Sequence, residues 1–309
     1  RTGSGVVIAA RPSGRGAEFP LGAEAWGLSR WAFDAALFRY AQSCGAQAFE
    51  EAKVVAFSGG GGSGLLRVEL GVPGAPPRRV ELRADVVVDA RGRPPAPSGA
   101  GPLYIGFKRR HRMKPGLSPQ DVLRGAVEVH LFAGGYCGLN SVEGGAVNVC
   151  LLARSGWLAS LESPLWEGTA QAMAARSPSL RRRLDALLPD GPPSAVARVH
   201  LAPTDTPRAL AVGDAAGMIA PLCGDGQAMA LESALLLGEL MAGTEPSRLM
   251  LEWSRIWTRR FASRIRLGRA LQSLLLHPWG AELAVGMVNL WPRSARLLLD
   301  GTRTPSLSR

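Results

Sequence analysis

Alternation between apolar and polar residues dominates the first third of the chain. Short alternating runs occupy residues 52–57, 65–70 and 80–82. They are separated by four glycines at 59–62 and by a Pro- and Gly-rich segment at 73–77. Strand-like runs punctuated by turn residues predict a three-stranded antiparallel meander.

A second strand-rich region follows the Pro-, Ser- and Gly-rich stretch at 94–102 and covers residues 104–153. Apolar and polar positions alternate along residues 127–132, with Glu128 and His130 on the second face. This pattern predicts a sheet with one packed face and one face towards a cavity or solvent.

Helical spacing appears between and after these strands. Residues 22–45 predict a loop and then a helix with Ser29 as its N-cap. Residues 165–188 predict helices that are broken at Pro178, and residues 227–241 predict a helix rich in Ala and Leu.

A long amphipathic helix is predicted over residues 253–275. Its apolar side carries Trp253, Trp257, Phe261, Ile265, Leu271 and Leu275, and its opposite side carries Arg255, Arg259, Arg266 and Arg269. We expect this helix to pack on its own domain, with peripheral membrane contact through the basic C-terminal helix as the alternative.

Composition narrows the classes of function. The 309 residues are 46% hydrophobic and 20% charged, which is typical of a globular protein. The net charge of +11 is spread along the chain and no nucleic-acid motif accompanies it, so we expect no nucleic-acid partner. The four cysteines and four histidines lack metal-ligand spacing, and a reduced cytoplasmic protein is expected. No apolar run reaches the length of about 18 residues that a transmembrane helix needs.

The most informative segment begins with the apolar run 209–212, which predicts a strand. It leads into Gly213 and Asp214, then a Gly-rich turn, and then the helix at 227–241. Glycines allow a ligand to approach the backbone closely, and a helix start presents N–H groups to an electron-rich ligand edge. A carboxylate at a strand end can accept hydrogen bonds from ribose-type hydroxyls.

This segment resembles the second flavin-binding motif of FAD-dependent oxidoreductases, the superfamily of aromatic hydroxylases, flavin halogenases and geranylgeranyl reductase-like enzymes. The matching residues run from 212 to 226, Val-Gly-Asp-Ala-Ala-Gly-Met-Ile-Ala-Pro-Leu-Cys-Gly-Asp-Gly. The resemblance implies that Gly213 and Asp214 bind the ribityl or ribose part of FAD. It also implies that Pro221, Gly224 and Gly226 lie along the isoalloxazine ring. The implied helix, starting at Gln227, points at the pyrimidine side of that ring.

Two further segments resemble the same superfamily. Residues 26–46 are similar to its helix with a Ser-Arg start, which implies that Arg30 lies near the FAD phosphates or ribityl chain. Residues 84–93 predict a strand and resemble its Val-Val-x-Ala-Thr-Gly segment, with Arg91 at the Thr position. The superfamily's opening βαβ unit with Gly-x-Gly-x-x-Gly is not found, so we expect an N-terminally truncated chain.

The fold expected from these observations is α/β. An FAD/NAD(P)-binding Rossmann-like domain, incomplete because its first βαβ unit is missing, is formed by residues 1–93 and 202–309 and includes the C-terminal helices. An interleaved antiparallel β-sheet substrate domain occupies residues 94–201.

The expected function is that of an FAD-dependent oxidoreductase acting on an apolar or aromatic small molecule. Hydride transfer from flavin N5 would make it a reductase, and a flavin hydroperoxide would make it a monooxygenase. NAD(P)H or another donor supplies the electrons, and the candidate acid–base residues are His130 and Tyr136. Neither the Asp-Gly motif of the hydroxylases nor the Trp-x-Trp-x-Ile-Pro motif of the halogenases is found. The alternative is a non-catalytic remnant with an incomplete FAD pocket.

Overall fold

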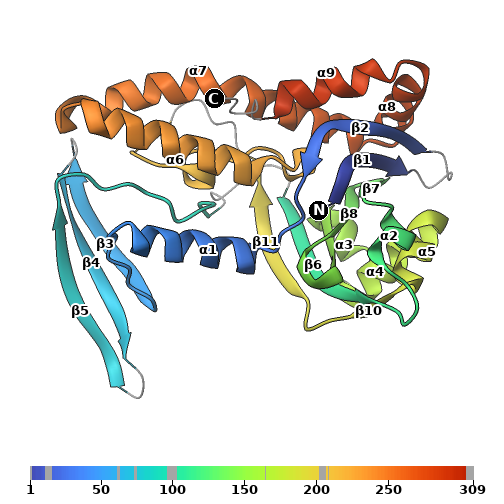
Figure 1. Cartoon of the computed structure of the whole chain (residues 1–309), viewed down its shortest axis with the longest axis horizontal. Coiled ribbons are helices and arrows are strands. Elements are labelled where there is room, and N and C mark those ends of the chain that lie inside the picture. Colours follow the sequence, from blue (N-terminus) through green and yellow to red (C-terminus); the bar gives the residue numbers. More distant parts are fainter. Residues whose placement is uncertain are drawn as a thin grey trace. The chain divides into compact units, whose positions relative to one another are not determined.

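The computed structural model describes residues 2–10, 16–60, 63–72, 75–95, 103–163, 165–201, 207 and 209–303. The chain forms two compact units (Figure 1). Unit 1 consists of Arg1–Ser29, Pro95–Leu201 and Leu267–Pro305, and unit 2 consists of Arg30–Pro94, Ala202–Arg266 and Ser306–Arg309. The sequence-based domain boundaries at 93 and 201 stay a prediction.

Unit 1 is built on an eight-stranded sheet with the order β10-β6-β9-β8-β7-β1-β2, and β11 pairs with β6. The only parallel pairing among its described strands joins β1 to β7, so the sheet is largely antiparallel, as predicted. Its strands are β1 (Thr2–Ala10), β2 (Gly16–Ala25), β6 (Leu103–Met113), β7 (Val127–Phe132), β8 (Gly135–Ser141), β9 (Val147–Arg154), β10 (Leu187–Pro189) and β11 (Ser194–His200).

Short helices pack apolar side chains against this sheet. Leu139, Val149 and Leu151 from the strands meet Leu158, Met173 and other helical residues in one buried cluster. The helices are α2 (Pro119–Leu123), α3 (Ser155–Ala159), α4 (Trp166–Arg176), α5 (Pro178–Asp185), α8 (Pro278–Leu290) and α9 (Arg293–Thr302). The predicted break at Pro178 is confirmed, because proline lacks the N–H that would continue α4 and instead begins α5.

Unit 2 contains the predicted meander. Strands β3 (Ala52–Gly60), β4 (Ser63–Val72) and β5 (Ala75–Ala84) pair antiparallel in that order. Val68 lies opposite both Val54 and Val80, so the alternating pattern sets the register of the sheet.

Helices α6 (Gly226–Gly243) and α7 (Pro246–Leu275) run alongside each other (Figure 1) and are joined by ion pairs. Trp253, Trp257, Phe261 and Ile265 of α7 are fully buried. They pack with α6 and with the apolar segments around Val86 and Leu210. The apolar side of α7 therefore belongs to the core, as expected. None of the helices in the described part of the chain has the length and apolarity that crossing a membrane would require.

Two expectations for unit 2 were wrong in detail. Residues 85–93 of the predicted strand 84–93 and residues 209–212 are not strands, because β5 ends at Ala84 and a single parallel bridge between Asp89 and Ala211 joins the two segments. Within the described residues, each segment pairs only with the other, through this one bridge. A β-ladder needs consecutive paired residues, so neither segment forms a strand.

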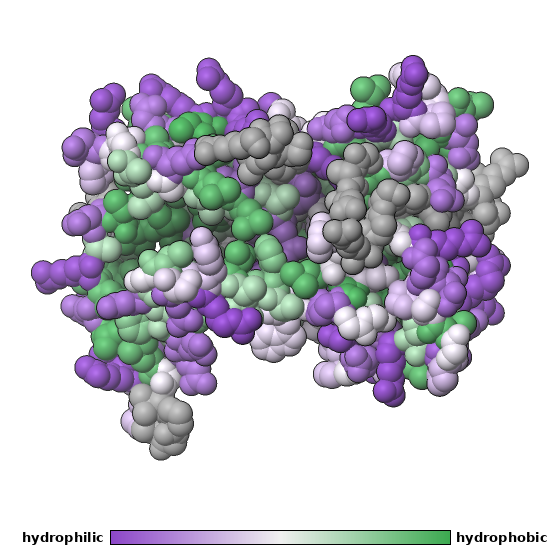
Figure 2. All heavy atoms as spheres, viewed as in Figure 1, coloured by the Kyte–Doolittle hydropathy of each residue, from purple (hydrophilic) through white to green (hydrophobic). Residues whose placement is uncertain are grey.

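Helix α1 (Arg30–Ser43) has no buried residue. Trp31, in its first turn, is 87% exposed. Hydrophobic surface is visible over α1 and the three-stranded sheet in Figure 2.

Candidate functional site

The turn at Gly213 and Asp214 is held by backbone pairing and by α7. The Asp89 amide donates to the Leu210 carbonyl at 2.7 Å, and the Val212 amide donates to the Asp89 carbonyl at 3.0 Å. The buried Trp253 indole donates to the Ala211 carbonyl at 3.0 Å. These bonds fix the chain immediately before the turn.

Gly213 itself requires glycine. Its φ of 59° lies in the left-handed region, and a Cβ there would come within 3.2 Å of the Ala230 Cβ on α6. Its amide donates to the Ser233 hydroxyl at 2.9 Å, and that hydroxyl donates to the Ala230 carbonyl at 2.8 Å. The close contact with Ala230 and the hydrogen bonds through Ser233 hold the turn against α6.

Asp214 projects from this seated turn and is half-buried. Burial raises the pKa of its carboxyl group above the usual range, although the nearby charges of Arg30 and Arg93 act in the opposite direction. Within the described part of the chain, the carboxylate accepts no hydrogen bond. A desolvated acceptor without a partner suits a ligand hydroxyl, so this position fits the ribityl or ribose group of FAD.

The loop that follows is open on one side. Pro221 begins a single 3-10 turn, Pro221–Cys223, and Gly224 ends it with a left-handed φ of 71°. A Cβ at Gly224 would meet no atom within 4 Å. Gly224 thus leaves space for a ligand to approach the backbone of the loop.

Helix α6 starts directly after this loop. Gly226 is its first residue, and Gln227, the second, has an exposed side chain. Burial and the charge of Asp225 raise the pKa of the Cys223 thiol to about 11. Cys223 is therefore a neutral thiol near pH 7, which suits a space-filling role and not that of a nucleophile.

Arg30 begins α1, and its side chain is exposed. Its guanidinium pairs with Asp34 at 2.8 Å, and its charge acts on Asp214. All seven predicted cofactor-binding residues therefore belong to unit 2, namely Arg30, Gly213, Asp214, Pro221, Gly224, Gly226 and Gln227.

His130 and Tyr136 lie in unit 1, on the neighbouring strands β7 and β8. His130 is 2% exposed; its Nε2 lies 3.0 Å from Glu128 Oε2, and its Nδ1 lies 3.4 Å from the Ser179 hydroxyl. Arg183 donates to both oxygens of Glu128, at distances of 2.7 to 3.0 Å. Burial raises the pKa of Glu128, but hydrogen bonds from His130 and Arg183 outweigh it and leave the pKa lowered.

The expectation that this side of β7 faces a cavity or solvent was wrong, because Glu128 and His130 are buried there in a polar network. Sequence alternation marked this face as polar, but it did not reveal Arg183, which comes from α5 and is 55 residues further along the chain. Tyr136 is also buried, on the adjacent strand.

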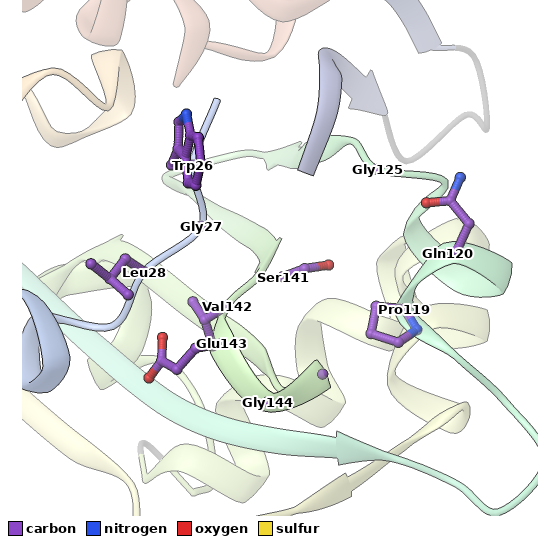
Figure 3. A pocket seen from close by; sticks show the side chains of 11 residues that line it. Trp26, Gly27, Leu28, Pro119, Gln120, Gly125, Ser141, Val142, Glu143 and Gly144 are labelled. Carbon is purple, nitrogen blue, oxygen red and sulfur yellow. The ribbon is translucent and has the colours of Figure 1, made fainter. Parts of the chain in front are cut away.

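Unit 1 also contains a pocket of about 510 Å³. Trp26 and Leu28 line one side of it, Pro119 and Gln120 the other, and Ser141 lies between them (Figure 3). An aromatic ring, apolar side chains and a few polar groups are typical of a site for a small organic molecule.

A glutamate fixes one wall of this pocket. Glu143 Oε2 accepts a 2.7 Å hydrogen bond from the Ser29 amide, next to Leu28. Hydrogen bonding from Ser29 lowers the pKa of Glu143. The segment that carries Trp26 is therefore anchored through a charged acceptor.

Several supporting residues were missed by sequence reasoning. Arg93 acts on Asp214, and Arg264 binds Asp225 inside the flavin-like motif. A signal for Arg264 was present, since it follows Trp257 by seven residues and so lies on the apolar side of α7. A charge at such a position commonly has a buried partner.

Comparison with solved structures finds this fold among flavoproteins. HpxO from Klebsiella pneumoniae, solved with FAD and uric acid, matches with a TM-score of 0.72 at 16% identity, over 96% of this chain and 79% of that chain. The flavin-dependent brominase Bmp2 matches with a TM-score of 0.69 at 16% identity, over 95% and 76%. The flavin-dependent halogenase CmlS matches with a TM-score of 0.66 at 16% identity, over 86% of this chain and 51% of that chain.

This chain thus spans about half the length of CmlS, at 51%. No family model and no curated protein matches the sequence. The structural matches nevertheless confirm the resemblance predicted from residues 212–226 at the level of fold. The chain shares its fold with the flavin-dependent halogenase CmlS, the flavin-dependent brominase Bmp2 and HpxO.

Proposed function

We propose that this protein is an FAD-dependent oxidoreductase that acts on an apolar or aromatic small molecule. The observation that carries the proposal is the half-buried Asp214 carboxylate, which lacks a hydrogen-bond donor among the described residues and lies on a turn seated against α6. An open glycine loop follows it at Gly224. HpxO, which has the same fold, was solved with FAD and a small heteroaromatic molecule, uric acid.

Each motif residue has a defined part in this proposal. Asp214 accepts hydrogen bonds from hydroxyl groups of FAD. The positive charges of Arg30 and Arg93 lie near Asp214 and attract the negatively charged phosphates of FAD. Gly224 and Gly226 have no side chains, so the flavin ring can lie close along the backbone of the loop. FAD, when bound, supplies the redox chemistry by accepting and passing on pairs of electrons.

His130 and Tyr136 are the proposed acid–base residues. The Glu128 carboxylate holds the His130 ring in one orientation, and Arg183 keeps that carboxylate charged. Both ring nitrogens have polar partners in the structure, Glu128 and Ser179, so proton transfer to a substrate requires one of these contacts to open. The pocket beside Trp26 is a candidate place for an aromatic substrate, because Trp26 offers a ring for stacking.

Oxygen consumption distinguishes the two proposed reactions. The FAD-loaded protein is supplied with NADH or NADPH and a panel of phenols, heteroaromatics and isoprenoid alkenes, and oxygen uptake is recorded together with nicotinamide oxidation. A monooxygenase requires oxygen for product formation, whereas a reductase forms product anaerobically. FAD binding without substrate-dependent turnover on any of these compounds would favour the remnant.

A further inference from the structure

Four charged side chains, three of them buried, form a group that includes Asp225 of the flavin-like loop. Arg264 of α7 donates from Nη2 to Asp225 Oδ2 at 2.5 Å and from Nη1 to Glu232 Oε2 at 2.8 Å. Arg260 pairs with the other oxygen of Glu232. Two guanidinium groups thus balance two carboxylates.

The Arg264 contacts are buried, which strengthens the interaction between the opposite charges. The side chains of Arg264, Asp225 and Glu232 are 9%, 10% and 4% exposed. The Arg264 guanidinium also lies 5.6 Å from the ring centre of Phe261, in cation–π range. Removing the Arg264 guanidinium takes its positive charge from two buried carboxylates, whereas Glu232 still keeps Arg264 when Arg260 is removed.

Asp225 occupies the N-cap position of α6, but its side chain makes no capping hydrogen bond there. Aspartate is among the preferred N-cap residues because its carboxylate normally accepts from the first turn of the helix. Here Arg264 binds the carboxylate instead, while the Asp225 carbonyl accepts from the Met229 amide at 2.9 Å. The Asp225 carboxylate therefore leaves the N–H groups of the first turn to other acceptors.

We propose that Arg264 is a positioning residue for the cofactor loop. It holds the Asp225 carboxylate away from the start of α6 and fixes the backbone of residues 224–226. The N–H groups in the first turn of α6 therefore stay available to a ligand and are not capped by Asp225. Its effect on FAD rests on the proposed function, whereas its effect on the loop does not. Without Arg264, the Asp225 carboxylate is free to turn towards the N–H groups of α6 and compete with the flavin.

The test compares Arg264→Met, Arg264→Lys and Arg260→Met with the wild-type protein. Amide hydrogen exchange of residues 221–230 is measured without ligand, and FAD is then titrated by flavin fluorescence. Arg264→Met should speed exchange in this segment at least tenfold, with strands β3–β5 unchanged, and should weaken FAD binding at least tenfold. Arg264→Lys should restore most of both properties.

Arg260→Met is the matched control, because Arg260 contacts Glu232 and is 41% exposed. It should change both measurements less than threefold. Equal losses in Arg260→Met and Arg264→Met, or unchanged exchange in Arg264→Met, would overturn the proposal.

If Arg264→Met does not fold, Asp225→Asn takes its place, since it weakens the same contact and keeps the size of the side chain. Its expected effects have the same direction and are smaller; unchanged exchange in a folded Asp225→Asn protein would likewise overturn the proposal. A wild-type protein that binds no FAD while exchange still responds to Arg264→Met would refute the proposed function alone.

Discussion

Substitution of Asp214 should affect ligand-free stability and FAD binding in opposite directions. Burial raises the pKa of this carboxyl group, so the folded protein without ligand disfavours its charged form. Asp214→Asn removes that charge, and the ligand-free variant should therefore unfold at a higher temperature than the wild type near pH 7.

The sign of the pH dependence follows from the raised pKa. The destabilisation of the wild-type protein by this charge is complete above the folded-state pKa of Asp214. It declines as the pH falls below that value and is absent below the lower unfolded-state pKa. The advantage of Asp214→Asn should thus shrink on acidification. A constant advantage at every pH would contradict the assignment of the effect to this ionisation.

Binding should respond in the other direction. A hydrogen bond to a charged group contributes about 1.5–3 kcal/mol, so Asp214→Ala should weaken FAD binding by roughly 10- to 150-fold. Asp214→Asn, which keeps a neutral acceptor, should lose less.

Titration of FAD followed by fluorescence, together with thermal unfolding from pH 4 to 8, measures both effects. The matched control is Asp85→Asn, because Asp85 is an exposed aspartate in the same unit. Unchanged FAD affinity in Asp214→Ala would refute the role of Asp214 as a cofactor ligand.

Three further substitutions test the supports of the site by thermal or denaturant unfolding. Gly213→Ala should destabilise the protein by about 1–2 kcal/mol, because its φ of 59° is left-handed and the new Cβ would lie 3.2 Å from α6; no loss of stability would show that the turn can relax. Trp253→Phe should cost about 1–3 kcal/mol by leaving a buried carbonyl without its donor, and a cost below 0.5 kcal/mol would show that this bond contributes little. Arg183→Met should cost about 3–5 kcal/mol near pH 7, because Glu128 would stay buried with only His130. The loss in Arg183→Met should diminish as the pH falls and Glu128 takes up a proton; a loss that grows on acidification would contradict this account.

Local patterns in the sequence predicted the elements whose structure depends on near neighbours. The meander follows from three alternating runs separated by Gly and Pro, and the break between α4 and α5 follows from Pro178. The Trp253 side of α7 was correctly assigned to the core, because apolar residues at helical spacing need a partner surface.

Long-range partners could not be predicted in the same way. Glu128 and His130 alternate with apolar residues as solvent-facing residues would, and only the fold brings Arg183 to Glu128. Residues 84–93 and 209–212 have the composition of strands, but only Ala84 belongs to one, because a ladder depends on the chains beside it. Arg264 was detectable as a charge on an apolar helix side, whereas its partner Asp225 was not.

The visible absorption spectrum of the purified protein, before and after incubation with excess FAD and gel filtration, tests the central claim most directly. The account predicts flavin bands that elute with the protein and that diminish strongly in Asp214→Ala. A wild-type protein that elutes without flavin under both conditions would contradict the proposal that residues 213–227 form a working FAD site.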